Sequence, residues 1–359
     1  MRHILRNTVG IWLVSFSVTV PFPYYFIGSF FSASSDSEIL YLIALYVLLF
    51  SITAAILYSK CVKSDKIKLE DLLRTIVAYI LSFFLLKYGV DKLLLQQFYT
   101  PKPNILFTPV GEMSKDILFW TSMGTSTSYN WFMALLEIIP GLLLLHSKTR
   151  ELGALIAFGV LLNVFMVNVG FDISVKLFSL YLFICSIYLI QPFTSKLIRL
   201  LTMKKEVQLA TAPKLLSSSP LIKRLLKSAV ICFFILEISI PYLNQTAQLN
   251  EFIGAYKVNS SSMLFGNNLK RIYIHSEEYF IIEDNEGQFH DYNSTITGNY
   301  IHLLDQKVGF QIHQHESKTE FRTIGLSDVK SISTTRIELN QLPAMQDDFH
   351  WTVEGMIGE

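Results

Sequence analysis

Long apolar runs separated by short polar links dominate residues 1–247. A helix needs about 20 mostly apolar residues to cross the hydrocarbon core of a bilayer, which is roughly 30 Å thick. The runs that reach this length predict seven transmembrane helices, at residues 8–32, 38–60, 72–98, 128–147, 151–171, 173–195 and 222–244.

After Asn244 the pattern changes to short segments in which apolar and polar residues alternate, such as LKRIYI and EYFIIED. Turn signals such as DNEG and TGN separate these segments, which is typical of consecutive antiparallel strands. About 100 residues suffice for a small sandwich or barrel. The whole pattern predicts an α-helical polytopic membrane bundle of about seven transmembrane helices, followed by a small all-β extracytoplasmic domain.

Composition supports a membrane protein and excludes one class of partner. The chain is 51% hydrophobic and 16% charged, with a mean hydropathy of +0.39, which is too apolar for an ordinary soluble domain. Residues 1–247 hold 22 Lys and Arg against 13 Asp and Glu, whereas residues 248–359 hold 8 against 16. An acidic tail does not favour a phosphate backbone, so we expect no nucleic acid as a partner.

Charge and hydropathy together predict four regions: two transmembrane helices in residues 1–70, a four-helix core in 71–200, a cytoplasmic loop and last transmembrane helix in 201–247, and an antiparallel β domain in 248–359. Lys and Arg recur in every second link, and the positive-inside rule assigns such links to the cytoplasm. We therefore expect a multi-pass protein of the bacterial inner membrane, with the lipid bilayer as its partner. Its N-terminus is expected in the cytoplasm and its β domain in the periplasm.

Charged and amide side chains inside the predicted spans mark a candidate site. A charge at mid-bilayer costs roughly 2.5 to 3.5 kcal/mol, so each such side chain must face protein or water. A rise of about 1.5 Å per residue puts most of them in one layer between mid-membrane and the outer surface. We expect this layer to form a ligand-binding pocket lined by Lys87, Asp91, Glu137, Asn163, Asn168, Asp172 and Lys176.

Some of these residues also have a purely structural interpretation. Asp172 near a helix N-terminus is favoured by the helix dipole, and Lys176, four residues later, can pair with it. The two asparagines can form hydrogen bonds between helices. Lys92 is expected to extend toward the membrane interface. Lys87 and Glu137 lie deep in their spans, so a ligand contact explains them best.

The expected pocket fits more than one chemistry. A buried Lys and a buried Glu can handle protons or bind a reducible ring. A quinone fits because its carbonyl groups accept hydrogen bonds and its reduction takes up protons, but a transported solute fits the same residues. We find no nucleophile with its base, no phosphate loop and no glycine fingerprint, so catalytic residues stay unassigned and an enzymatic activity stays open.

Histidine and cysteine usage gives no reason to expect a metal site. His313 and His315 alternate onto one face of a predicted strand, where solvated histidines are common. The three cysteines, Cys61, Cys185 and Cys232, are far apart in the sequence. Neither pattern predicts a zinc site or a disulfide framework.

Three features recur in order along the predicted core. Glu137 is followed by Gly141 and LLLL, a charged turn leads into RELGALIA, and Asn163 lies in the next helix. With this order and spacing, residues 75–192 resemble the DoxX family of bacterial membrane proteins. The resemblance implies a four-helix membrane core, and some relatives are associated with quinone-linked sulfur oxidation or membrane redox complexes. This chain departs from the family by its additional helices and its β domain.

The sequence is compatible with two main functional hypotheses. The first is a quinone- or redox-associated subunit of the inner membrane, with its polar pocket in the outer half of the bilayer and a redox protein as partner. The alternative is a non-catalytic membrane scaffold or interaction subunit, whose β domain docks a periplasmic partner. A transporter is a less favoured third interpretation, because the predicted helices show no repeat.

Overall fold

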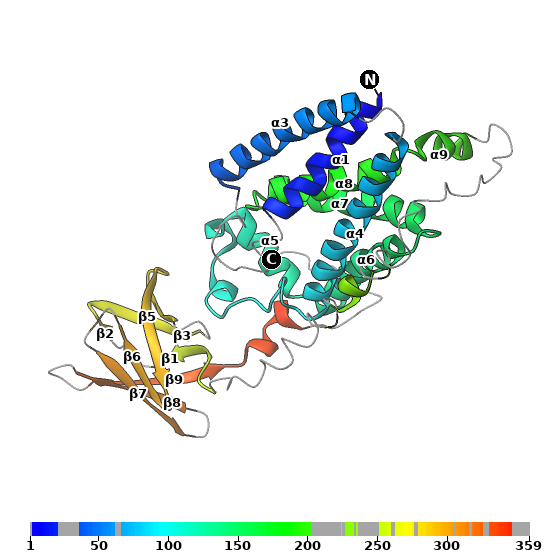
Figure 1. Cartoon of the computed structure of the whole chain (residues 1–359). Helices are drawn as coiled ribbons and strands as arrows, with labels where there is room; N and C mark the ends of the chain where they lie inside the picture. Colours follow the sequence, from blue (N-terminus) through cyan, green and yellow to red (C-terminus); the bar gives the residue numbers. More distant parts are fainter. Residues whose placement is uncertain are drawn as a thin grey trace. The chain divides into compact units, whose positions relative to one another are not determined.

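The chain forms two compact units, which are described separately (Figure 1). Unit 1 comprises Met1–Gln97 and Tyr129–Leu243, and unit 2 comprises Phe98–Ser128 and Asn244–Glu359. The computed structural model describes residues 2–20, 36–61, 66–202, 224, 227–232, 235, 251–259, 263–275, 279–304, 306, 308–315, 318–325 and 330–346.

Unit 1 is helical. Its described helices are α1 (Arg2–Thr19), α3 (Glu38–Cys61), α4 (Lys66–Leu93), α6 (Thr127–Leu145), α7 (Arg150–Gly170), α8 (Lys176–Ile190) and α9 (Thr194–Leu201). Helix α1 packs on α3, α4 and α8, and α7 packs on α8 (Figure 1). The shared core is rich in aromatic rings, and the ring of Phe16 lies 5.0 Å from that of Tyr181. These contacts join segments from both ends of the helical sequence.

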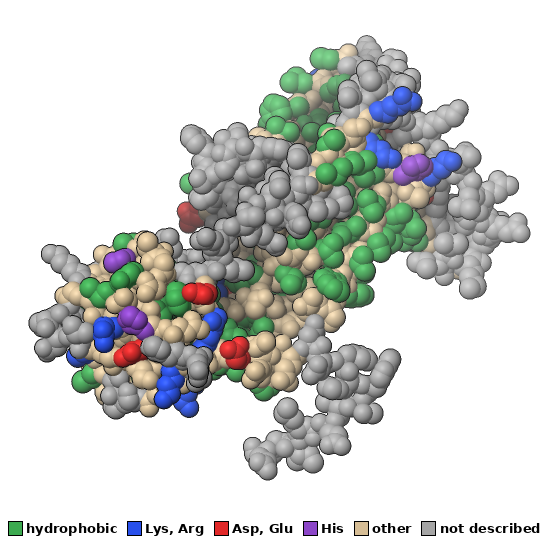
Figure 2. Space-filling model, turned by 90° about the horizontal axis from the view of Figure 1, so that it is seen from below, with side chains coloured by type: hydrophobic (Ala, Val, Ile, Leu, Met, Phe, Trp, Pro, Cys, Tyr) green, Lys and Arg blue, Asp and Glu red, His purple; other side chains and the backbone are tan. Residues whose placement is uncertain are grey.

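The outer faces of the unit 1 helices are apolar. In α3 only one stripe is buried, while large side chains elsewhere on the helix, such as Tyr46 and Phe50, are more than half exposed. Figure 2 shows hydrophobic side chains spread over the helical unit. Among the described residues, three helices are long and apolar enough to cross a membrane: α3, α6 within Thr127–Leu144, and α7. This unit therefore has the features of a membrane-associated protein.

The prediction of about seven transmembrane helices is wrong. Helix α8 has 15 residues and would extend only about 22 Å, and the apolar part of α1, Ile4–Thr19, is also short. Helix α4 is long enough, but its uncharged stretch runs only from Thr75 to Leu86. The expected span at residues 222–244 lies mostly outside the described residues. The predicted span in α4 was thus accepted on its length, although charged residues lie toward both ends of the helix.

Unit 2 contains an antiparallel β-barrel. Its strands are β1 (Gly254–Val258), β2 (Met263–Leu264), β3 (Asn267–Ile274), β4 (Tyr279–Asp284), β5 (Phe289–Thr297), β6 (Tyr300–Leu303), β7 (Gly309–His315), β8 (Lys318–Ile324) and β9 (Ser331–Ile337). Neighbouring strands pair from β3 through β9, and β9 pairs with β1. The ladder between β1 and β3, from Gly254 opposite Ile274 to Lys257 opposite Arg271, closes the barrel. Short β2 pairs only with the start of β3.

Aromatic side chains fill the barrel interior. The rings of Phe280 and Phe310 stack with centroids 4.8 Å apart, and the ring of Tyr256 lies 5.3 Å from that of Phe321. All four side chains are essentially inaccessible to solvent. The barrel centre is therefore a packed core.

A distant segment of the chain packs on the outside of the barrel. Residues 98–128 form two short 3-10 helices, Ile105–Phe107 and Val110–Glu112, and helix α5 (Lys115–Gly124). The ring of Phe107 lies 4.5 Å from the Arg271 guanidinium and 5.9 Å from the Tyr273 ring. Unit 2 is thus assembled from two segments that are far apart in the sequence.

Glu283 organises the same outer face of the barrel. Its carboxylate accepts hydrogen bonds from Arg271 at 2.8 Å and from the Tyr273 hydroxyl at 2.5 Å, and it pairs with Lys270 at 2.8 Å. Burial raises the pKa of Glu283, but the hydrogen bonds from Lys270, Tyr273 and Arg271 outweigh burial and hold the pKa below its usual value. A lowered carboxyl pKa means that the charged form stabilises the folded barrel.

We expect Glu283→Gln to lower the free energy of unfolding of unit 2 by about 1 to 3 kcal/mol, because two cationic groups and a hydroxyl lose their charged acceptor. The wild-type contribution is present above pH 4.5 and is lost as the pH falls through the lowered pKa. Hydrogen exchange of β3 and β4 in the full-length protein measures both effects. Glu286→Gln, in an exposed turn, is the control; equal protection in the two variants would contradict the prediction.

A second prediction concerns the packing of α4 on α6. A Cβ at Gly89 would lie 2.6 Å from Cγ1 of Ile138 and 3.1 Å from the Ala134 carbonyl oxygen. Gly89→Ala should therefore destabilise unit 1 by about 1 to 3 kcal/mol, seen as a lower thermal midpoint in detergent. Gly159→Ala, where a Cβ meets nothing within 4 Å, should leave the midpoint unchanged or raise it. The reverse order of midpoints would disprove this packing.

Candidate functional site

The first part of the predicted pocket is an ion pair on α4. Nζ of Lys87 lies 2.7 Å from Oδ1 of Asp91, one helical turn later, and both side chains are 13% exposed. Spacing of four residues puts the two side chains on one face of the helix, as expected. Because the two charges are opposite, the ion pair lowers the free-energy cost of placing either charge in a membrane interior.

Glu137 is paired with Lys92. Nζ of Lys92 lies 2.7 Å from Oε2 of Glu137, and both side chains are more than nine-tenths buried. The same ammonium group donates to Oε1 of Gln97 at 2.8 Å and lies 5.7 Å from the Tyr88 ring. The expectation that Lys92 extends toward the membrane interface is therefore wrong, because its counterion lies on α6. This pair joins α4 to α6 through the interior of unit 1.

Asp172 and Lys176 belong to a turn between α7 and α8. Asp172 has a left-handed backbone with φ of 55°, and the N–H of Ile173 donates to the Asn168 carbonyl at 2.9 Å, as in a Schellman motif. The Asp172 carboxylate lies 2.8 Å from Nζ of Lys176 and its side chain is 81% exposed. The expected pairing of Asp172 with Lys176 is confirmed, but Asp172 lies at the C-terminal end of α7 and not in the first turn of a helix.

Asp36 binds the same turn, and the sequence analysis did not predict this role. Its carboxylate accepts hydrogen bonds from the backbone N–H groups of Lys176 at 2.8 Å and Leu177 at 3.0 Å, at the start of α8. Its backbone N–H donates to the Ser174 carbonyl at 2.8 Å. An anion at a helix N-terminus is electrostatically favoured. The only sequence signal was an acidic residue in a polar link, SASSDSE.

The two asparagines of the predicted pocket differ in environment. Asn163 is exposed on α7, whereas Asn168 is buried near the end of the same helix. The charged residues of the predicted set all have an ionic partner among the described residues. They form two groups, one on α4 and α6 and one at the α7–α8 turn. Their role in binding a ligand remains a prediction. Glu237, an acid within the expected span at residues 222–244, lies outside the described residues.

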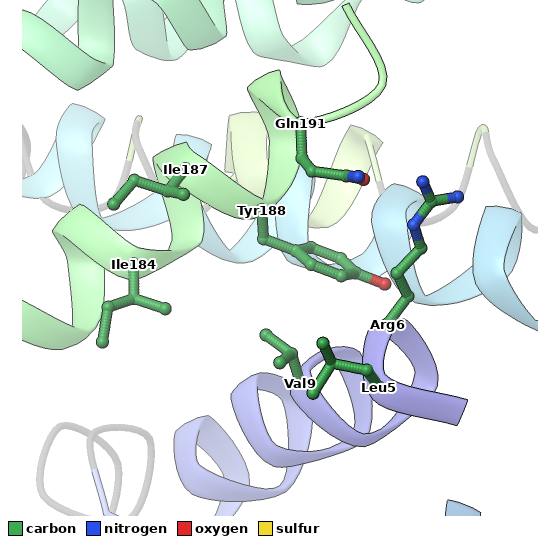
Figure 3. Close-up of a pocket in the computed structure, with 7 residues that line it drawn as sticks. All are labelled: Leu5, Arg6, Val9, Ile184, Ile187, Tyr188 and Gln191. Atoms are coloured by element: carbon green, nitrogen blue, oxygen red, sulfur yellow. The ribbon is translucent and has the colours of Figure 1, made fainter. Parts of the chain in front are cut away.

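A cavity of about 480 Å³ lies elsewhere in unit 1, between α1 and the end of α8 (Figure 3). It is lined by Leu5, Arg6, Val9, Ile184, Ile187, Tyr188 and Gln191. The aliphatic side chains form its walls, and the polar side chains come together at one end (Figure 3). This size falls within the range of small-molecule pockets, and apolar walls with a few polar groups are their usual composition.

An ionic network supports the polar end of the cavity. Glu70 accepts hydrogen bonds from Arg74 at 2.8 Å and from Arg6 at 3.3 Å. Arg74 also donates to the Tyr188 carbonyl at 2.5 Å and to Oε1 of Gln191 at 2.8 Å, and its guanidinium lies 4.6 Å from the Tyr188 ring. Helices α1, α4 and α8 therefore meet at one buried cluster.

The Tyr188 hydroxyl is buried but makes no hydrogen bond within the described part of the chain. The residue is 5% exposed, and Figure 3 shows its side chain extending from α8 toward the side of α1 that carries Arg6. A Cβ at Gly10 would lie 2.5 Å from this hydroxyl, so α1 approaches closely only because glycine is there. Buried hydroxyl groups normally have a partner.

Sequence reasoning did not find this cavity. Arg6 is one of the basic residues from which the membrane orientation was predicted, and Tyr188 and Gln191 lie near the end of the predicted span at residues 173–195. One pattern in the sequence could have pointed to the ionic network beside the cavity. Glu70 and Arg74 lie one helical turn apart at the start of an apolar run, where they can form an ion pair. In the residues that the structure describes, no group of three or more His, Cys, Asp or Glu side chains is arranged to hold a metal ion.

The Lys92–Glu137 pair gives a direct prediction. Glu137→Gln should lower stability by about 3 to 5 kcal/mol, because it leaves the buried Lys92 ammonium without its counterion. The double variant Lys92→Met with Glu137→Gln should recover much of the loss, since neither position then carries a charge. Thermal midpoints in detergent measure both effects, with Glu38→Gln at an exposed helix start as the control. A double variant less stable than Glu137→Gln alone would contradict this.

Comparison with known proteins gives one curated relative. The chain is 31% identical over 110 residues to the uncharacterized protein YwoB of Bacillus subtilis (strain 168), and the match covers 31% of this chain and 70% of that protein. No family model matches the sequence, so the resemblance to DoxX remains a prediction. No solved structure matches it either. Over this shared segment, the chain belongs to the same protein family as YwoB.

Proposed function

We propose that this chain is an integral protein of the bacterial inner membrane that binds a lipid-soluble small molecule in the cavity between α1 and α8. The observation that carries the proposal is the composition of that cavity, which has aliphatic walls, one polar end and a volume of about 480 Å³. Such a site suits a molecule with an apolar body and a polar head.

The ionic residues first expected to bind the ligand support a different role. Lys87 with Asp91, and Lys92 with Glu137, are paired at 2.7 Å. A paired ion has already recovered part of its desolvation cost, so it gains less from a ligand. The α1–α8 cavity instead has the polar side chains of Arg6 and Gln191 at one end of an aliphatic lining.

A quinone, the ligand class expected from the sequence, has the required combination of a carbonyl-bearing ring and an apolar tail. It would make this chain a quinone- or redox-associated membrane subunit. The support is chemical complementarity alone, and the proposal assigns no catalytic residue.

The proposed orientation follows from charge. Basic residues lie at the start of α1 (Arg2 and Arg6), at the end of α3 (Lys60), and in the link from α6 to the first residue of α7 (Lys148 and Arg150). Their positions favour a cytoplasmic location for these helix ends. The segment 98–128 carries only Lys102 and Lys115 as basic residues, which favours the exterior. The barrel packs on this segment through Phe107, so we propose that the barrel is exterior as well.

Organic extraction of the purified full-length protein, followed by mass spectrometry, tests this function. We expect a lipid-soluble molecule at near-stoichiometric amount, and about tenfold less of it in Ile184→Trp, whose larger side chain fills the cavity. Ile139→Trp on the exposed face of α6 is the control and should retain the molecule. Equal content in Ile184→Trp and wild type, or no bound molecule in wild type, would refute the proposal.

A further inference from the structure

We infer that the α1–α8 cavity is a groove for one hydrocarbon chain of a bilayer amphiphile. The head group of this molecule lies between Arg6 and Gln191, and its chain runs along the groove past Ile184. This inference rests on the proposed function and adds the class of the ligand and its orientation. It sets no condition on whether the head group donates or accepts hydrogen bonds.

Helices α1 and α8 run in opposite directions along the cavity. Near the start of α1, Arg6 lines the cavity together with Gln191, which follows the last residue of α8. Further along α1, the ring of Phe16 lies 5.0 Å from that of Tyr181, which is earlier in α8. The polar end of the cavity therefore lies at the ends of both helices, and the cavity extends from there toward Ile184 (Figure 3).

The distribution of charge assigns the head group to this end. Neither helix carries a charged residue over the rest of its length from there, between Asn7 and Thr19 of α1 and between Leu177 and Ile190 of α8. The Arg6 side chain is 34% exposed, so its guanidinium can reach the membrane surface. A head group placed deeper would exchange water for aliphatic neighbours, which is costly for any polar group.

The groove is open along one side. Leu5 and Ile187 line the cavity, yet they are 66% and 42% exposed. In a bilayer, exposed aliphatic side chains lie against lipid tails, which are as apolar as they are. An occupant of the groove would therefore keep one side in contact with the bilayer. This geometry favours a molecule that is itself a component of the membrane.

The length of the groove fits one leaflet of the bilayer. Ile184 precedes Gln191 by seven residues, which is about 10 Å along a helix. The hydrocarbon of one leaflet is about 15 Å thick. A chain that starts beside Gln191 therefore passes Ile184 before it reaches the middle of the bilayer. Successive carbons of the chain should contact successive turns of α8.

The test uses the full-length protein in vesicles of phosphatidylcholine and phosphatidylglycerol. Two photoreactive probes are compared, hexadecanol with a diazirine at carbon 3 or at carbon 10, and tandem mass spectrometry locates the cross-links. The carbon-3 probe should label Leu5 and Gln191, and the carbon-10 probe should label Val9 and Ile184. A tenfold excess of unmodified hexadecanol should lower this labelling about tenfold, because the two molecules compete for one site.

Contact with bulk lipid is controlled on another helix. Ile139 of α6 is 47% exposed, and its labelling should not fall when hexadecanol is added in excess. Ile184→Trp fills the groove and should lower labelling of α1 by the carbon-10 probe about tenfold, whereas Ile139→Trp should retain it. The order of the labels in the wild type decides the orientation even if Ile184→Trp does not fold.

The outcomes separate the two proposals. If excess hexadecanol displaces neither probe from α1 and α8, no chain binds in the cavity, and the proposed function fails together with the inference. A groove covered by a second copy of the chain would give this result. If displacement occurs but both probes label the same residues, or label them in reverse order, the cavity binds a lipophile and only the inferred orientation is overturned.

Discussion

Buried charges need partners, and in unit 1 this requirement is met largely through α4. Near its start, Glu70 and Arg74 connect α4 to α1 and α8, and near its end Lys92 connects it to Glu137 of α6. Between these points, the Ser82 hydroxyl donates to the Gly141 carbonyl at 2.7 Å. Because isolated ions in a low-dielectric interior are costly, each pair fixes which helices can be neighbours.

The cavity follows from the same network. Arg74 donates hydrogen bonds to the Tyr188 carbonyl and to the Gln191 side chain at the end of α8, and its guanidinium stacks on the Tyr188 ring. These contacts hold the end of α8 against α4, and the cavity lies between this end and α1. The network therefore both stabilises the helices and defines the polar end of the site, so a change to Arg74 would affect folding and binding together.

Unit 2 uses a buried carboxylate in a comparable way. Glu283 gathers Lys270, Arg271 and Tyr273 on one outer face of the barrel, and Phe107 packs on this cluster from a segment more than 150 residues earlier. The barrel interior, in contrast, is closed by aromatic packing. The binding chemistry we propose is thus in the helical unit, while the interior of the barrel is filled by its own side chains.

The apolar helices, the alternating strands and the shared helix face of Lys87 and Asp91 could be predicted from the sequence, because periodicity and a spacing of four residues are local properties. Only the tertiary structure decided that Lys92 pairs with Glu137, that β1 closes the barrel on β3, and that Arg6, Tyr188 and Gln191 line one cavity. The number of spans was overestimated because apolar runs were counted as spans although α8 has 15 residues and α4 carries charged residues at both ends. Partners distant in sequence are selected by the packing of whole helices and strands, and a local pattern carries no information about that packing.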